Sequence, residues 1–267
     1  MFEVLSYTFF QKALLAGLLI SLISWILWSL VLLRQEPNIT HSIANILFLG
    51  IVISFFFAGD YYLFAFLFAV LSVVVLVYIE KYTPASRASS KEIISQIWLA
   101  GGIFGIGMLG NIQIDIFNFL FWSILFVDTK DIYALAVMLV IGAAIWFLFG
   151  RKFLCVALSP EIAKSQWIKA GLYEVWYLLY LALFIAVSLK IFWVLLLGAF
   201  LVLSGNIGKL LSKNLFWVFV IATIASMISV VAWLFASYYF DTSAWATIVL
   251  ILGIIFLVSS LFQRNAS

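Results

Sequence analysis

Long apolar stretches recur along the whole chain and leave room for only short polar connections. A hydrocarbon core of about 30 Å is crossed by about 20 helical residues. Nine segments come close to that length or exceed it: 8–33, 42–58, 61–79, 93–110, 132–149, 172–189, 191–207, 215–239 and 244–262. Backbone groups inside hydrocarbon must be hydrogen-bonded within the protein, so these segments predict an all-α fold, a polytopic transmembrane helical bundle.

The number of spans depends on the junction of the sixth and seventh segments. Only Lys190 separates them, so they form either two spans, giving nine, or one broken helix, giving eight. The first segment is too long for a cleavable signal peptide, and Arg34 follows it where a small-residue cleavage site would be expected. We therefore expect it to remain as a span.

Composition excludes several other classes of protein. Of the 267 residues, 67% are hydrophobic and 9% are charged, whereas a soluble domain is about half apolar and a quarter charged. We expect one transmembrane domain, 1–267, with an inner loop at about 150–171 and no catalytic or nucleotide-binding domain. A net charge of +3 does not indicate nucleic-acid binding.

Residues that could carry enzymatic chemistry are scarce. One histidine and one cysteine exclude a His-rich zinc protease site, a thiolate metal cluster and a disulfide within the chain. No glycine-rich phosphate loop is present, so the chain is not expected to hydrolyse ATP or to bind a cofactor. The glycine-rich segment from Gly101 to Gly110 is apolar and predicts close helix packing.

Basic residues gather in alternate connections. In a nine-span count one side receives Arg34, Lys81, Arg87, Lys91, Arg151, Lys152, Lys164, Lys169, Lys209, Lys213 and Arg264. The other side receives Asp60, Asp115, Asp128, Asp131 and Asp241, with Lys130 and Lys190 as exceptions. Lys and Arg are enriched in cytoplasmic loops. The pattern predicts an outer N-terminus and an inner C-terminus in a multi-pass protein of the cell membrane. The eight-span count places the N-terminus inside and leaves the later loops as stated.

The longest inner loop contains a helix-start pattern at Ser159-Pro160-Glu161. Serine is a common helix cap, proline suits the first turn, and an acid is stabilised at the positive end of the helix dipole. A short capped helix on the inner face suits docking of a cytoplasmic partner. It also suits a plain connector between two spans, and the residues alone leave both interpretations open.

Several segments, in order and spacing, resemble the permease subunit of the zinc/manganese/iron class of ABC transporters. Ser159 to Lys164 resembles the family's Asp-Pro-Glu-Leu-Ala-Arg coupling segment, and Ser237 to Asp241 resembles its Ser-Tyr-Tyr-Leu-Asp element. Gln11 to Gly17 and Val31 to Arg34 also fall where the family has similar sequences. Gly198 to Lys209 follows another family stretch, with Ser204 in place of a proline.

The resemblance implies an importer of a divalent transition metal, built from several chains. Cytoplasmic ABC ATPase subunits would bind ATP and dock on Ser159, Pro160, Glu161, Ala163 and Lys164. A second permease subunit would complete a homodimer, and an extracellular or periplasmic metal-binding protein would deliver the zinc, manganese or iron ion. This chain would then be a transporter subunit rather than an enzyme. An ATP-independent carrier of a small solute, or a degenerate permease serving as structural partner in a heterodimer, are the alternatives.

The family's metal-site helix begins with Gly-Asp and has a histidine four residues after the Asp. Counted from Arg34, those positions are His41 and Asn45. Residues four apart share a helix face, so the pair can point at one ligand. The pair lacks the carboxylate of an ordinary zinc or manganese site. Its alternative role is that of a helix-start residue and a polar packing group.

Tryptophan repeatedly stands where the family has glycine. The positions are Trp25, Trp28, Trp122, Trp167, Trp193, Trp233 and Trp245. Glycine lets membrane helices approach closely, and tryptophan there would overpack them. Our hypothesis is that UGA codons, which some genetic codes read as glycine, have been translated as tryptophan.

Overall fold

The structure is a computed structural model of the chain. It describes residues 8–34, 38–57, 59–82, 87–108, 127–159, 163, 165–189, 191, 194–240 and 244–266.

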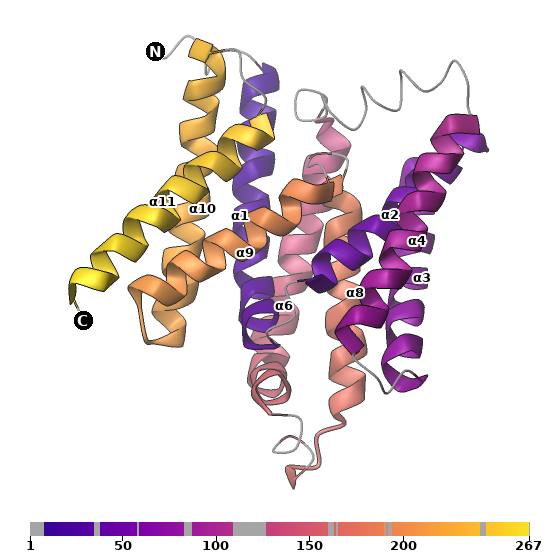
Figure 1. The fold of residues 1–267 in the computed structure, drawn as a ribbon, viewed down its shortest axis with the longest axis horizontal. Helices are drawn as coiled ribbons and strands as arrows, with labels where there is room; N and C mark the ends of the chain where they lie inside the picture. The colour runs from indigo at the N-terminus through magenta and orange to yellow at the C-terminus, as the bar shows by residue number, and fades with distance from the viewer. Residues whose placement is uncertain are drawn as a thin grey trace.

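The described part of the chain consists of nine α-helices joined by short connections (Figure 1). They are α1 (Thr8–Arg34), α2 (Asn38–Phe56), α3 (Tyr61–Tyr82), α4 (Arg87–Met108), α6 (Thr129–Leu158), α8 (Ala170–Leu189), α9 (Val194–Leu211), α10 (Leu215–Phe240) and α11 (Ala244–Ala266). The predicted all-α bundle is confirmed. The sixth and seventh predicted spans are two separate helices, α8 and α9.

Six of these helices are long and apolar enough to cross a membrane: α1, α2, α3, α6, α8 and α10. In α9 and α11 the described apolar segments are shorter, Leu197–Leu211 and Thr247–Leu261. The first turns of α4 carry Lys91, Glu92 and Gln96, which makes its average composition more polar.

Helix α6 differs from the prediction at its C-terminal end. The predicted span ends at 149, whereas the helix continues to Leu158. The reason is local: no proline occurs within α6, Gly142 and Gly150 are accommodated within the helix, and the extended backbone of Ser159 (φ −157°, ψ 110°) stops it. The polar connection to α8 is correspondingly shorter than the predicted loop at 150–171.

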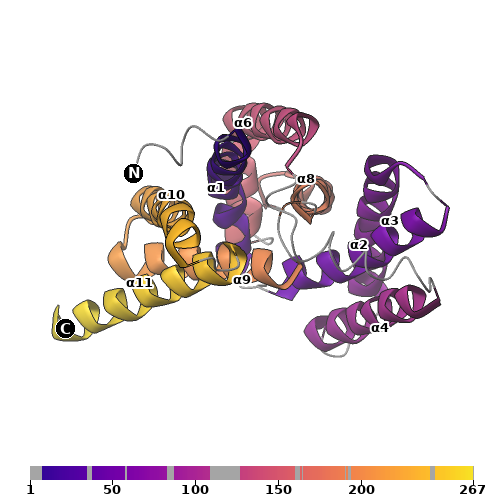
Figure 2. The ribbon, with the colours of Figure 1, turned by 90° about the horizontal axis from the view of Figure 1, so that it is seen from above.

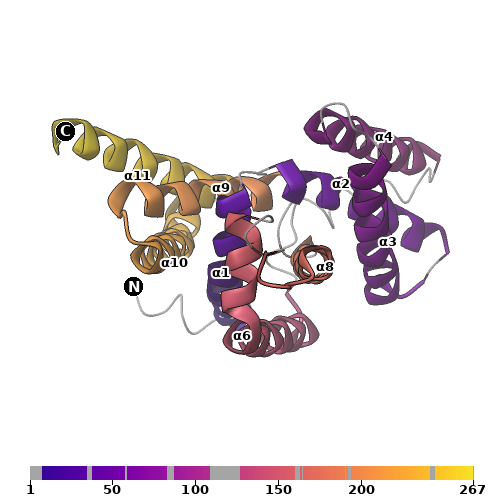
Figure 3. The ribbon, with the colours of Figure 1, turned by 90° about the horizontal axis from the view of Figure 1, so that it is seen from below.

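The helix contacts follow a two-fold pattern. Helix α2 packs on α3 and α4, and α9 packs in the same way on α10 and α11. Helix α1 packs on α10, and α8 packs correspondingly on α3. Helix α6 packs on both α1 and α8. Figures 2 and 3 show α3 and α4 at one side, α10 and α11 at the other, and α1, α6 and α8 between them. Because α1 and α8 cross in opposite directions, the correspondence is that of an inverted repeat.

Glycines allow the close contacts within this arrangement. A Cβ on Gly102 of α4 would lie 2.5 Å from the Phe48 ring of α2, and one on Gly17 of α1 would lie 2.6 Å from Val230 of α10. A Cβ on Gly208 of α9 would meet the backbone oxygen of Val218. These positions use the absence of a side chain to bring two helices together.

Candidate functional site

Helix α2 is the most enclosed of the six candidate spans, with 72% of its apolar window buried. It contacts α3, α4, α8 and α9. His41 and Asn45 lie one turn apart near its start, and Asn45 Nδ2 is 3.3 Å from His41 Nε2. Asn45 is fully buried and His41 is partly buried. The structure therefore brings the two predicted residues together, as their spacing requires.

Three buried side-chain oxygens near the start of α2, one of them in this pair, have no hydrogen-bond partner. Thr40 Oγ1, Ser42 Oγ and Asn45 Oδ1 are all buried and have no partner. We call Thr40, His41, Ser42 and Asn45 the α2 polar cluster. Several other buried serines behave differently, because Ser21, Ser24 and Ser54 each donate to a carbonyl three or four residues earlier in their own helix. Ser188 of α8 is a further buried serine without a partner.

Position at the helix start explains part of this contrast. The residues three and four before Thr40 precede α2, so its hydroxyl has no helical carbonyl in the usual place. Ser42 follows Asn38 by four residues and still makes no such bond. Unpartnered polar atoms inside a membrane protein cost several kcal/mol each in the absence of water, which makes the buried oxygens of α2 candidates for binding a polar ligand.

The α2 polar cluster offers a cation only uncharged ligand atoms: oxygens and one imidazole nitrogen. When the Asn45 amide donates to Nε2, His41 is the neutral tautomer with its proton on Nδ1, and Asn45 Oδ1 faces away from the ring. Among the described residues no three His, Cys, Asp or Glu side chains gather closely enough to hold a metal ion. A cation at this cluster would be held by one amide oxygen, hydroxyls, backbone carbonyls and retained water.

Acidic residues gather at the starts of α3 and α6. The Asp60 carboxylate accepts from the backbone N–H of Tyr62 at 3.0 Å, and Asp131 Oδ2 accepts from the backbone N–H of Asp128 at 2.8 Å. The Tyr62 hydroxyl donates to the other oxygen of Asp131, which is fully buried. These carboxylates satisfy the free N–H groups of two helix starts and join α3 to α6.

The second candidate region is the connection from α6 to α8. The Ala163 N–H donates to the Ser159 carbonyl at 3.1 Å, which closes one helical turn, and Ala163 is fully buried. Ser165, Gln166 and Trp167 are exposed. Pro160, Glu161 and Lys164 lie outside the described residues. The turn starts where the sequence predicts a cap, and a docking role for Ser159 and Ala163 stays a prediction.

Trp167 ends this turn in a conformation that favours glycine. Its φ is 59°, and it is the only residue other than glycine with a positive φ in the described part of the chain. The next residue, Ile168, donates its N–H to the Ala163 carbonyl at 3.0 Å. This bond joins residues five apart, and the left-handed residue, Trp167, comes directly before its donor. The arrangement is the Schellman motif at a helix C-terminus, where the left-handed residue is usually glycine. The Trp167 side chain is 95% exposed.

The structure adds residues that sequence reasoning did not find. Thr40 and Ser42 flank the predicted pair, and Asp131, predicted for an outer loop, is instead buried against Tyr62. The hydroxyl at 40 could have been noticed, because a first-turn hydroxyl lacks its usual helical acceptor; nothing in the sequence indicates the unpartnered hydroxyl at 42. Nothing in the sequence indicates the Tyr62–Asp131 contact, which joins residues far apart in the chain.

Comparisons with known proteins place these features in a family. The model of the ABC 3 transport family matches residues 6–263. The chain is 26% identical over 265 residues to the high-affinity zinc uptake system membrane protein ZnuB of Haemophilus influenzae, covering 99% of each chain. It is 23% identical over 259 residues to the manganese transport system membrane protein MntC of Listeria monocytogenes, covering 97% of this chain and 92% of that protein.

Two solved structures share the fold. PsaBC from Streptococcus pneumoniae in complex with Fab superposes with a TM-score of 0.84 at 22% identity, covering 96% of this chain and 94% of that one. An inward-facing conformation of a putative metal-chelate type ABC transporter gives a TM-score of 0.72 at 13% identity, covering 97% and 85%. The family match extends over nearly the whole helical bundle, and the chain is a multi-pass membrane protein that belongs to the ABC 3 transport family.

Proposed function

We propose that the chain is the membrane-spanning permease subunit of an ABC importer for a divalent transition metal such as zinc or manganese. The observation that carries the proposal is the α2 polar cluster. Its buried oxygens lack partners in the most enclosed candidate span, and a polar cargo crossing the bundle would supply those partners. The zinc and manganese systems named for the relatives support a metal as the cargo.

The proposed importer contains further chains. Separate ATPase subunits bind and hydrolyse ATP and dock on the α6–α8 connection from Ser159 to Lys169. A second permease subunit forms a homodimer with this chain, and an extracellular or periplasmic binding protein delivers the ion. The family and the printed title of the PsaBC complex support an assembly of several chains.

The chemistry of the α2 polar cluster suits transient binding. Without a carboxylate, the cluster provides no full negative charge to offset the two positive charges of the ion. The start of α2 is also the positive end of its helix dipole. An ion held by neutral oxygens and one imidazole keeps part of its water, and conduction requires a site that the ion can leave.

Metal uptake by the reconstituted complex, normalised to folded permease, tests this assignment. His41→Ala should reduce uptake by roughly 10-fold or more, because it removes the only imidazole in the chain. The double variant His41→Asp with Asn45→His should bind the metal more tightly, because it restores a carboxylate beside an imidazole.

Ser54→Ala is the matched control, since Ser54 is a buried serine of the same helix whose hydroxyl bonds to its own backbone. It should leave uptake unchanged. If His41→Ala transports as well as the parent, the α2 polar cluster is not the metal site.

A further inference from the structure

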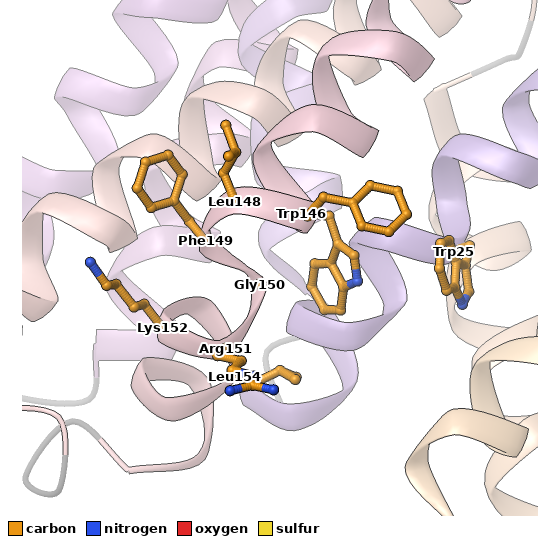
Figure 4. A pocket seen from close by; sticks show the side chains of 9 residues that line it. Trp25, Trp146, Leu148, Phe149, Gly150, Arg151, Lys152 and Leu154 are labelled. Atoms are coloured by element: carbon orange, nitrogen blue, oxygen red, sulfur yellow. The ribbon is translucent and has the colours of Figure 1, made fainter.

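A groove lined by aromatic and basic side chains lies at the C-terminal end of α6. The groove has a volume of about 390 Å³ and is lined by α6 residues from Trp146 to Leu154 and by Trp25 of α1. Figure 4 shows Phe149 and Lys152 on one side of α6, with Trp146 between them and Trp25 of the neighbouring helix. Aromatic and cationic side chains thus line the same groove.

Depth in the membrane distinguishes this groove. Helix α6 starts at Thr129 and has reached Arg151 after about 33 Å at 1.5 Å per residue, and the hydrocarbon core is about 30 Å thick. Arg151 and Lys152 thus lie at the level of the lipid headgroups. Trp146 lies just above them, where tryptophan is enriched in membrane proteins.

The face of α6 around the groove is open to the membrane. Only 17% of the apolar window of α6 is buried, the smallest fraction among the candidate spans. Phe147 is 84% exposed and Leu148 is 74% exposed. Because lipid is the solvent for such a face, acyl chains cover these side chains unless another protein does.

The charged residues among the described lining of the groove are both basic. Arg151 and Lys152 are exposed, and no described residue that lines the groove carries a carboxylate. Lys152 Nζ lies 5.6 Å from the centre of the Phe149 ring and 6.0 Å from that of Tyr173, which holds the ammonium beside the groove. The Arg151 guanidinium can bind a phosphate through two N–H groups.

We infer that this groove binds the headgroup of an anionic phospholipid of the inner leaflet. The phosphate lies against Arg151 with Lys152 beside it, and the acyl chains follow the exposed face of α6. The volume suits a headgroup rather than a whole lipid, since pockets for small molecules measure about 300–1,000 Å³. The site needs Trp146, Arg151 and Lys152, and it does not need a ring at position 25.

The test is native mass spectrometry of the full-length chain, titrated in detergent with phosphatidylglycerol or phosphatidylcholine. We expect phosphatidylglycerol to bind more tightly. Each basic residue near an anionic lipid surface contributes enough for roughly a 5-fold change in affinity. Arg151→Gln with Lys152→Gln should therefore weaken binding by roughly 25-fold. Lys209→Gln with Lys213→Gln removes two charges from the α9–α10 end of the bundle and is the control, with affinity unchanged.

Three outcomes overturn the proposal. Equal affinity for the two lipids, or equal loss in both double variants, shows that no headgroup is recognised at this groove. Competition by soluble glycerol 3-phosphate at the lipid's own concentration shows a site for a free phosphate. A disulfide between copies carrying Leu148→Cys, in a Cys155→Ser background in bilayers, shows that a second copy covers the face.

Discussion

Single residues in this protein show how the membrane changes the usual cost of a polar atom. Ser21, Ser24 and Ser54 are buried without penalty because each donates to its own helix. Thr40 and Asn45 are buried at the same depth of packing and retain unpartnered oxygens. For Thr40 the difference is one of position, since a hydroxyl in the first turn has no helical carbonyl three or four residues before it. Asn45 Oδ1 is an acceptor and lacks a donor instead.

Trp167 has a left-handed backbone conformation, which is unfavourable for a residue with a side chain. A left-handed conformation costs an L-residue roughly 1–2 kcal/mol, and glycine pays no such cost. Trp167→Gly should therefore raise the thermal midpoint of the purified chain or leave it unchanged, although the side chain is lost. Trp176→Gly is the control: Trp176 is an exposed tryptophan inside α8, where glycine should lower stability by roughly 0.5 kcal/mol.

The coding DNA tests the origin of Trp167 directly. UGA at this codon supports the hypothesis that a glycine has been translated as tryptophan, and UGG rules it out. Trp25 and Trp233 differ from Trp167, because they lie within helices and Trp233 is almost fully buried. Trp122 and Trp193 lie outside the described residues, and nothing is described of the side chains at Trp28 and Trp245.

Among the structural elements, the closely packed helix pairs stabilise the bundle, and one turn lies at its surface. Helix pairs such as α1 with α10 and α2 with α4 approach through glycines. In the turn from Ser159 to Trp167, Ala163 is buried and Ser165, Gln166 and Trp167 are exposed. Packing therefore determines whether the bundle folds, and the turn is free to present side chains to a partner.

Gly208→Ala should destabilise the α9–α10 pair by roughly 1–3 kcal/mol, because the new Cβ meets the backbone oxygen of Val218, which cannot rotate away. Gly198→Ala, in the same helix, meets nothing within 4 Å. It should be neutral or stabilising by up to about 1 kcal/mol, since alanine favours helix. Thermal unfolding in detergent measures both, and equal midpoints would contradict the close approach of the two helices.

Glu161→Lys, or replacement of Pro160 by two glycines, should uncouple metal uptake from ATP hydrolysis while the bundle stays folded. The reason is that a surface turn contributes little to packing but determines the geometry of docking. Lys213→Glu reverses a charge on the exposed α9–α10 connection and is the control. Undiminished ATPase binding and uptake in both Pro160 and Glu161 variants would reduce the segment to a connector.

The whole molecule is an inverted repeat with α6 between its halves. In Figure 1, α6 ends and α8 begins at the lower end of the bundle, while α6 begins and α10 ends at the upper end. The basic residues Arg151, Lys152 and Lys169 belong to the lower end and Asp128 to the upper end. The distribution of Lys and Arg predicts that the lower end is cytoplasmic.

Reporter fusions test this orientation. A reporter inserted between 155 and 165 should be cytoplasmic, and reporters near Asp128 and Asp241 should be outside. The expected result follows from the excess of Lys and Arg on one side, which membrane insertion retains in the cytoplasm. A cytoplasmic reporter at Asp128 would invert the orientation and place the proposed docking turn outside the cell.

The sequence by itself determined the solvent, the fold class and the sharing of one helix face by His41 and Asn45. Length and apolar composition leave helices as the only element for these spans, and a four-residue spacing orients two side chains alike in any helix. The tertiary structure decided what depends on contacts between distant segments. These are the burial of Asp131 against Tyr62, the enclosure of α2, and the groove beside Arg151. The physical reason is that lipid solvates every apolar helix face about equally well, so hydrophobicity does not determine which helices pack together. Shape at residues such as Gly17, Gly102 and Gly208 makes that choice.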